Sequence, residues 1–135
     1  MPKQQAIELP DLPASGRPRF WEVVPLAVRH ANLVYTTGLV GVDLATGQPA
    51  AEGDFEAEVV KTFENLKAIL EQAGSGLEKV LSVTSYLKDY RLWPQYNEIY
   101  KRYFTTPPRP ARTTVGADLF PPYRFEITAI AYVDD

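Results

Sequence analysis

The feature that most constrains this 135-residue chain is one long amphipathic segment near its middle. Between residues 55 and 73, apolar side chains recur at intervals of three and four, the period of one face of an α-helix. They are Phe55, Val59, Phe63, Leu66, Leu70 and Ala73. Asp54 precedes this stripe in the place of an N-cap, and Gly74 follows it where a left-handed residue is favoured. The pattern predicts a helix that buries one face.

A β-sheet is predicted to supply the surface under this helix, because the flanking segments are rich in β-branched and aromatic residues. Strands are expected over residues 20–28, 33–41, 79–87, 112–119 and 124–133, with a tight turn at 29–32 and a loop at 44–53. Pro25 interrupts the first of these strands.

A second, shorter helix is predicted from four aromatic residues at helical spacing. They are Trp93, Tyr96, Tyr100 and Phe104. The proline-rich segment at 105–111 then predicts a rigid loop. The order β-β-α-β-α-β-β is typical of an α+β domain with two helices on one face of a mixed sheet. The other face would need a cover, which self-association would supply.

Length and composition predict a single domain, residues 1–135, in which residues 1–19 form a loose arm with room for one short extended piece, because four prolines and a glycine interrupt them. Hydrophobic residues make up 45% and charged residues 23%, as in ordinary globular proteins. The net charge of −3 argues against binding to a nucleic-acid backbone. The sequence has neither a run of about 20 apolar residues nor a signal-peptide pattern, so a cytoplasmic protein without membrane contact is expected.

The absence of cysteine removes thiol nucleophiles and thiolate metal sites, and the single His30 cannot build a multi-histidine centre. The sequence also lacks the glycine-rich phosphate loops and the HExxH and GxSxG motifs. No metal and no cofactor are therefore expected. A site would have to use arginine, glutamate, asparagine, threonine, tyrosine and backbone groups.

Three residues stand out, and each has two interpretations. Arg112 opens a predicted strand after the proline-rich loop. Its planar guanidinium could bind a carboxylate through two hydrogen bonds, or Arg112 could be an ordinary surface arginine or one that holds a loop in place. Glu126 lies in a strand with apolar alternate residues, so it either faces solvent or is buried, where its pKa would rise and it could deprotonate a water. Asn97 either ties a loop or faces a site.

Several segments, taken together, resemble the RidA/YjgF family of small enamine/imine deaminases, also called the L-PSP endoribonuclease family. The match is densest in PARTTVGADL at 110–119, RFEITAIA at 124–131 and YNEIYKRYF at 96–104, and it extends to VYTTGLVGVDLATG at 34–47. The resemblance covers about residues 24–133. It implies a chorismate-mutase-like α+β fold, a homotrimer with sites between subunits, and cofactor-free hydrolysis of 2-imino or 2-enamino acids to 2-oxo acids and ammonia.

The resemblance also implies roles for individual residues. Arg112 matches the arginine that binds the substrate carboxylate, and Glu126 matches the glutamate associated with the attacking water. Asn97 matches an asparagine near the pocket, Thr37 stands at the position of a pocket serine, and Thr114 in the arginine motif is expected to touch substrate.

Two positions depart from the family pattern. Val24 stands where a pocket tyrosine is expected, and Leu39 replaces the glutamine of an S-G-Q motif. Loss of the tyrosine would enlarge the pocket and favour a different or bulkier substrate, unless Trp21 or Tyr35 fills the volume. These departures keep a second hypothesis open, a non-catalytic small-ligand-binding or chaperone-like protein. A third, a ribonuclease or translation inhibitor, is disfavoured by the negative charge.

Overall fold

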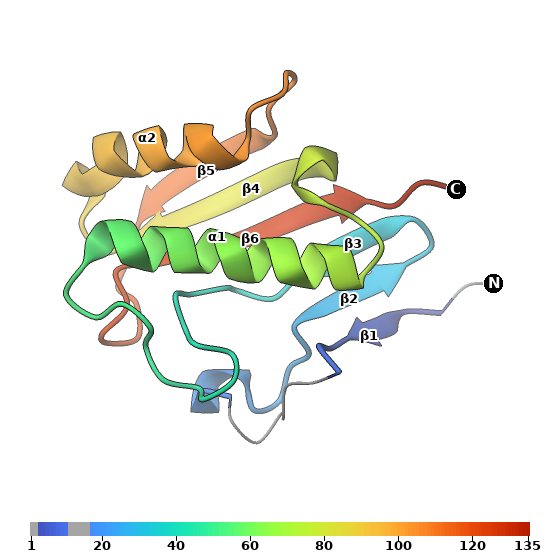
Figure 1. Cartoon of the computed structure of the whole chain (residues 1–135), viewed down its shortest axis with the longest axis horizontal. Helices are drawn as coiled ribbons and strands as arrows, with labels where there is room; N and C mark the ends of the chain where they lie inside the picture. Colours follow the sequence, from blue (N-terminus) through green and yellow to red (C-terminus); the bar gives the residue numbers. More distant parts are fainter. Residues whose placement is uncertain (1–2, 11–16) are drawn as a thin grey trace.

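Six strands form one mixed sheet in the order β1-β2-β3-β6-β4-β5, and two helices lie on one of its faces (Figure 1). The computed structural model describes residues 3–10 and 17–135. The strands are β1 Gln5–Ile7, β2 Ala27–His30, β3 Leu33–Thr36, β4 Val80–Leu87, β5 Ala111–Gly116 and β6 Phe125–Tyr132. The helices are α1 Phe55–Gln72 and α2 Trp93–Tyr103, with single 3₁₀ turns η2 Arg19–Trp21, η3 Leu77–Lys79 and η4 Tyr90–Leu92. The pairing of β4 with β5 is parallel and the others are antiparallel, so the predicted α+β class is confirmed.

The N-terminal third differs from the prediction. The short strand β1 is the one extended piece expected within the N-terminal arm; it pairs with β2 and so adds a strand to the predicted order. The rest of that arm, residues 1–2 and 11–16, lies outside the described residues. The strand predicted at 20–28 is wrong over most of its length, because residues 19–21 form a 3₁₀ turn and β2 begins only at Ala27, after Pro25. Proline has no N–H to donate to a strand ladder, which explains the late start.

The predicted turn between β2 and β3 is confirmed, and it is tight. Only Ala31 and Asn32 separate the two strands, and Ala31 adopts a positive φ of 53°. The strand predicted over 33–41 ends early, at Thr36. The Thr36 hydroxyl accepts a hydrogen bond from the backbone N–H of Ala129 on β6 at 3.0 Å, so a side chain rather than a backbone carbonyl is the acceptor on β3.

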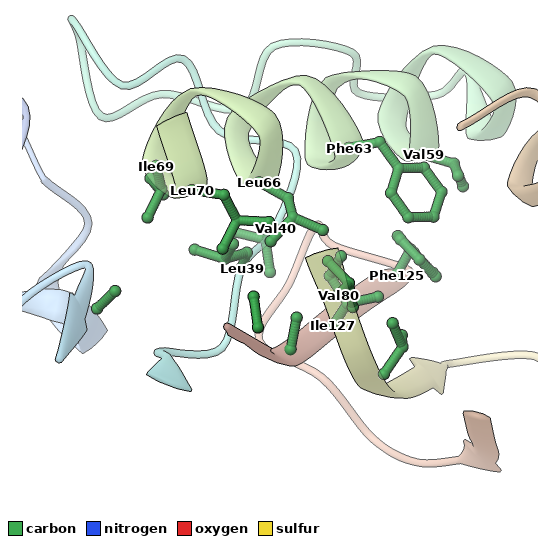
Figure 2. Close-up of a cluster of buried hydrophobic side chains, with 14 of the residues drawn as sticks. Leu39, Val40, Val59, Phe63, Leu66, Ile69, Leu70, Val80, Phe125 and Ile127 are labelled. Carbon is green, nitrogen blue, oxygen red and sulfur yellow. The ribbon is translucent and has the colours of Figure 1, made fainter. Parts of the chain in front are cut away.

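Helix α1 follows the sequence pattern closely. The carboxylate of Asp54 accepts from the N–H of Ala57 at 3.0 Å, and Gly74 takes a φ of 84° after the last turn. Its apolar stripe is buried against the sheet: Figure 2 shows side chains of α1 pointing toward Phe125 and Ile127 of β6. Helix α2 packs beside α1 through Tyr96, Ile99, Tyr100 and Phe104.

Trp93 does not belong to the buried face of α2, contrary to the prediction. Its side chain is 51% exposed, because it is the first residue of the helix and precedes the turn that meets the core. Ile99, only 1% exposed, contributes to that face instead. No helix in the described part of the chain is long and apolar enough to cross a membrane.

The two faces of the sheet differ, and this difference positions the site. On β6, Phe125 and Ile127 face the helices and are fully buried, whereas Glu126 and Thr128 alternate with them toward the opposite face. No helix covers that opposite face in the described residues (Figure 1).

Candidate functional site

Arg112 lies on the edge strand β5 with its guanidinium against two tyrosine rings of α2. Its Cζ atom is 4.6 Å from the centroid of the Tyr100 ring and 5.2 Å from that of Tyr96. Because Arg112 is paired with the buried Val83 in parallel register, its side chain projects from the helix side of the sheet. Cation–π contacts of this kind contribute about 0.5–2 kcal/mol each and restrict where the guanidinium can lie.

Tyr96 is the more deeply buried of these two tyrosines. Its ring is fully buried, and its hydroxyl shares a short hydrogen bond with the hydroxyl of Ser85 on β4. Burial raises the pKa of Tyr96 to about 12, although the Ser85 hydrogen bond and the nearby Arg112 act in the opposite direction. Tyr96 is therefore neutral at physiological pH and serves as a platform rather than as a proton carrier.

A cavity of 390 Å³ opens beside this arginine. It is lined by Asn97, Tyr100, Lys101, Arg109, Pro110 and Arg112. The Tyr100 hydroxyl is buried and has no hydrogen-bond partner among the described residues. Burial raises the pKa of Tyr100, and the charges of Arg112 and Arg109 partly oppose that effect. The cavity is thus rich in positive charge and in donors, which suits a carboxylate.

Glu126 lies in a different cavity, of 500 Å³, on the opposite face of the sheet. The other residues that line it are Tyr86, Ala117, Asp118, Leu119, Phe120 and Pro121. Burial raises the pKa of the Glu126 carboxyl above its ordinary value. A carboxylate with a raised pKa is a stronger base than an exposed one, so it can accept a proton from water more readily.

Gly38 lies against the Glu126 carboxyl group and leaves room for it. A Cβ atom at position 38 would lie only 3.0 Å from Cδ of Glu126 and closer still to Oε2. The carbonyl of Gly38 accepts a hydrogen bond from the indole N–H of the buried Trp21 at 2.9 Å. Trp21 therefore fixes the backbone that faces Glu126, instead of filling an empty pocket.

The remaining candidate residues are distributed between the two sides. Thr37 adjoins Gly38, and its N–H donates to the carbonyl of Leu26 at 3.0 Å. Thr114 is exposed on β5, two residues after Arg112, and so points to the same side of the strand.

The two departures from the family pattern lie outside both cavities. Leu39 is fully buried in the core and pairs with Ile127 through the backbone. Val24 is half-buried after the η2 turn, where its carbonyl accepts from Arg17 at 3.1 Å. Neither residue lines the Arg112 cavity or the Glu126 cavity.

Within one chain, Arg112 and Glu126 do not meet. On β4, Arg112 is opposite Val83, which faces the helices, and Glu126 is opposite Tyr86, which faces away from them. Their Cα atoms are separated by two strand spacings and three residues, roughly 14 Å, with the sheet between the side chains. The structure thus brings Arg112 together with Asn97, and Glu126 together with Gly38, as two half-sites.

Comparison with known proteins decides the family. Residues 22–133 match the family model described as Endoribonuclease L-PSP. The chain belongs to this family. A RutC family protein of Pyrococcus abyssi is 37% identical over 107 residues, covering 78% of this chain and 83% of the relative. A 2-iminobutanoate/2-iminopropanoate deaminase of Dermatophagoides farinae is 32% identical over 109 residues, covering 80% and 84%.

Solved structures of this family share the fold. RidA from the Antarctic bacterium Psychrobacter superposes with a TM-score of 0.81 at 30% identity, covering 96% of this chain and 99% of that one. The Rid family protein YyfA from Yersinia pestis gives a TM-score of 0.84 at 26% identity, covering 97% of this chain and 100% of that one. These similarities bear out the fold that the sequence motifs implied.

Sequence reasoning missed three residues that shape the two half-sites. Gly38 and Tyr100 lie within segments that carry the family resemblance, but their roles depend on contacts with strands remote in sequence. Arg109 lies between two prolines in the proline-rich loop. Its positive charge, three positions before Arg112, is the one signal in the sequence that could have indicated a role.

Proposed function

We propose that this protein hydrolyses reactive 2-imino and 2-enamino acids to 2-oxo acids and ammonia, without a cofactor, in clefts between the subunits of a homotrimer. The observation that carries the proposal is the position of Arg112. Its guanidinium lies against two tyrosine rings beside a cavity, and none of the described residues that line this cavity is a carboxylate. The deaminase among the relatives supports the same reaction class.

Arg112 would bind the carboxylate that every 2-imino acid carries. Its forked donors match two carboxylate oxygens, and Asn97 in the same cavity would add an amide donor or acceptor. Anchoring the carboxylate fixes C2, the carbon of the C=N bond, relative to the protein. Because imines already hydrolyse in water, positioning of this kind can supply much of the rate enhancement.

Glu126 would act on the water. Its carboxylate accepts one proton from the water as the water oxygen bonds to C2, and the C=N electron pair moves to nitrogen, which takes up that proton from Glu126. In the resulting amino alcohol the hydroxyl proton moves to the amino nitrogen, the C–O bond becomes C=O as the C–N bond breaks, and ammonia leaves. Burial raises the pKa of Glu126, which makes its carboxylate a stronger base toward the water than an exposed glutamate would be.

The inter-subunit cleft follows from the placement of the two half-sites. One molecule of substrate cannot touch both Arg112 and Glu126 of one chain, since the sheet lies between them. The uncovered face also carries apolar side chains, among them Tyr35 at 44% and Val115 at 38% exposure. Burying that face against a neighbour would cover these side chains and bring the neighbour's Arg112 to Glu126. The number of three subunits is taken from the family resemblance.

A non-catalytic ligand-binding role is the second candidate. The sequence favours it in one respect: Val24 and Leu39 lack the hydroxyl and the amide of the family pattern, although neither residue lines the Arg112 cavity or the Glu126 cavity. Ligand binding without turnover would need only the Arg112 cavity.

Imine trapping tests the proposal. An amino-acid oxidase generates 2-imino acids in situ, and a nucleophilic trap records what remains unhydrolysed, with wild type, Arg112→Ala and Arg102→Ala compared. Arg102 is an exposed arginine on α2 whose Nη2 lies 3.5 Å from Glu56, so it is a matched control outside the cavity. We expect wild type and Arg102→Ala to suppress trapping and Arg112→Ala to lose this effect. Binding of 2-oxo acids without any suppression by wild type would favour the ligand-binding role.

A further inference from the structure

We propose that Arg109 forms a second anion-binding position beside Arg112, so that the cavity selects imino acids with a second carboxylate on a short side chain. This inference rests on the proposed function, since it specifies which substrates that site accepts. Dicarboxylic imines of four or five carbons are the substrate class it names.

Arg109 is held in place by the loop that carries it. It lies between Pro108 and Pro110, and its Nε donates to the carbonyl of Phe104 at 2.7 Å, across the loop between α2 and β5. Prolines on both sides restrict the backbone, so little backbone entropy is lost when a ligand binds here, and the hydrogen bond to Phe104 restrains the side chain. The terminal nitrogens of the guanidinium are not used in that hydrogen bond.

The charges around the cavity are unbalanced. Of its three cationic lining residues, Lys101 is paired with Glu98, with 2.9 Å between Nζ and Oε1. Arg109 and Arg112 have no carboxylate within ion-pair distance among the described residues. Within one chain, two guanidiniums therefore line one cavity without a counter-charge, and a ligand with a single carboxylate can form a bidentate pair with only one of them.

Tyr100 provides an independent sign that a polar ligand belongs here. Its side chain is only 4% exposed, it lines the cavity, and its hydroxyl has no partner in the described structure. Leaving a buried hydroxyl without a hydrogen bond costs about 1–3 kcal/mol, so such groups are usually satisfied by a ligand or water. Arg109 and Arg112 line the same cavity as this hydroxyl, and the charges of both act on its pKa in the direction opposite to burial.

The spacing fits a small dicarboxylate. Arg109 lies three positions before Arg112, so their Cα atoms are at most about 10 Å apart, and both long side chains reach the same cavity. The carboxyl carbons of a four- or five-carbon dicarboxylate lie about 4–5 Å apart when extended. A cavity of 390 Å³ holds a molecule of that size.

Competition between substrates measures the selectivity. Oxidases acting on aspartate and on alanine generate a dicarboxylic and a monocarboxylic imine, and kcat/KM is determined for each with wild type, Arg109→Gln and Arg102→Gln. We expect wild type to prefer the dicarboxylic imine. The ratio of the two kcat/KM values should fall roughly tenfold in Arg109→Gln, the usual effect of losing one charged contact, and stay the same in Arg102→Gln.

Calorimetric titration with 2-oxoglutarate and 2-oxobutanoate gives a readout that does not depend on turnover. Tighter binding of the dicarboxylate, lost in Arg109→Gln, supports the second anion position even if no imine is hydrolysed, and in that case only the proposed reaction fails. Hydrolysis of monocarboxylic imines with no dicarboxylate preference in either assay overturns the inference and leaves the proposed reaction standing. An equal change in Arg102→Gln and Arg109→Gln would also overturn it, because it would indicate a general effect of surface charge.

Discussion

Replacing Gly38 by alanine tests whether the position of Glu126 matters for the reaction. The new Cβ would lie 3.0 Å from Cδ of Glu126 and closer still to Oε2, so the carboxyl group must retreat by about 1 Å to reach ordinary van der Waals separation. The carboxyl is the end of a flexible side chain, so it can move without unfolding the sheet. A catalytic group displaced by this distance loses about 10–100-fold in rate.

The stability of this variant should change little. Gly38 has no positive φ, so alanine fits the backbone, and the free energy of unfolding should stay within about 1 kcal/mol of wild type. Gly116→Ala is the matched control, because its Cβ would be 3.6 Å from Tyr90, an ordinary contact. Imine trapping measures activity and thermal unfolding measures stability.

A double-mutant cycle identifies the route of the effect. If Gly38→Ala acts through Glu126, then adding it to Glu126→Gln should reduce the residual activity little further. Full activity in Gly38→Ala would refute the assigned position of Glu126. An additive loss in the double variant would show that position 38 acts by another route.

Four further outcomes are expected. Arg112→Lys keeps the charge but loses the planar fork, so kcat/KM should fall about 100-fold with little change in Tm; unchanged turnover would contradict carboxylate binding by Arg112. Burial raises the pKa of Glu126, and a base must be deprotonated to act, so kcat/KM should rise with pH through a pKa above the ordinary 4.5. Glu126→Gln should abolish this rise, and a flat wild-type profile would argue against a glutamate base. Glu58→Ala removes the acceptor for the N–H groups of Arg124 and Phe125 and should cost about 1–3 kcal/mol of unfolding free energy, more than Glu58→Gln; equal losses in calorimetry would contradict this role. Since burial also raises the pKa of Glu58, its contribution to stability should decline as pH rises from about 4.5 through the raised folded-state pKa, a decline that Glu58→Gln should remove.

Local patterns in the sequence predicted the elements whose packing is simple. Helix α1 could be placed from Asp54 to Gly74 because its apolar stripe, its N-cap and its C-terminal glycine all lie within one continuous segment. The alternation around Glu126 likewise predicted β6. The segment before Ala27 was assigned wrongly because its aromatic and β-branched residues pack as a turn against the core. Such tertiary packing overrides local strand preference.

The residues of the site could be named from the sequence, but their arrangement could not. Arg112 was recognisable from its motif, whereas its contact with Tyr100 requires α2 to lie over β5. The placement of Arg112 and Glu126 on opposite faces follows from strand register, which is decided by pairing between distant segments. The role of Gly38 depends on the same pairing.

The measurement that tests the central claim most directly is complementation between two inactive variants. Arg112→Ala and Glu126→Gln are purified, mixed in equal amounts, dissociated and reassociated, and imine hydrolysis is compared with each variant alone treated identically. If each site takes Arg112 from one subunit and Glu126 from its neighbour, about one quarter of the sites in random mixed oligomers carry both wild-type residues. We therefore predict recovery to about a quarter of wild-type activity. Mixed oligomers that form but stay as inactive as the separate variants would contradict the shared site.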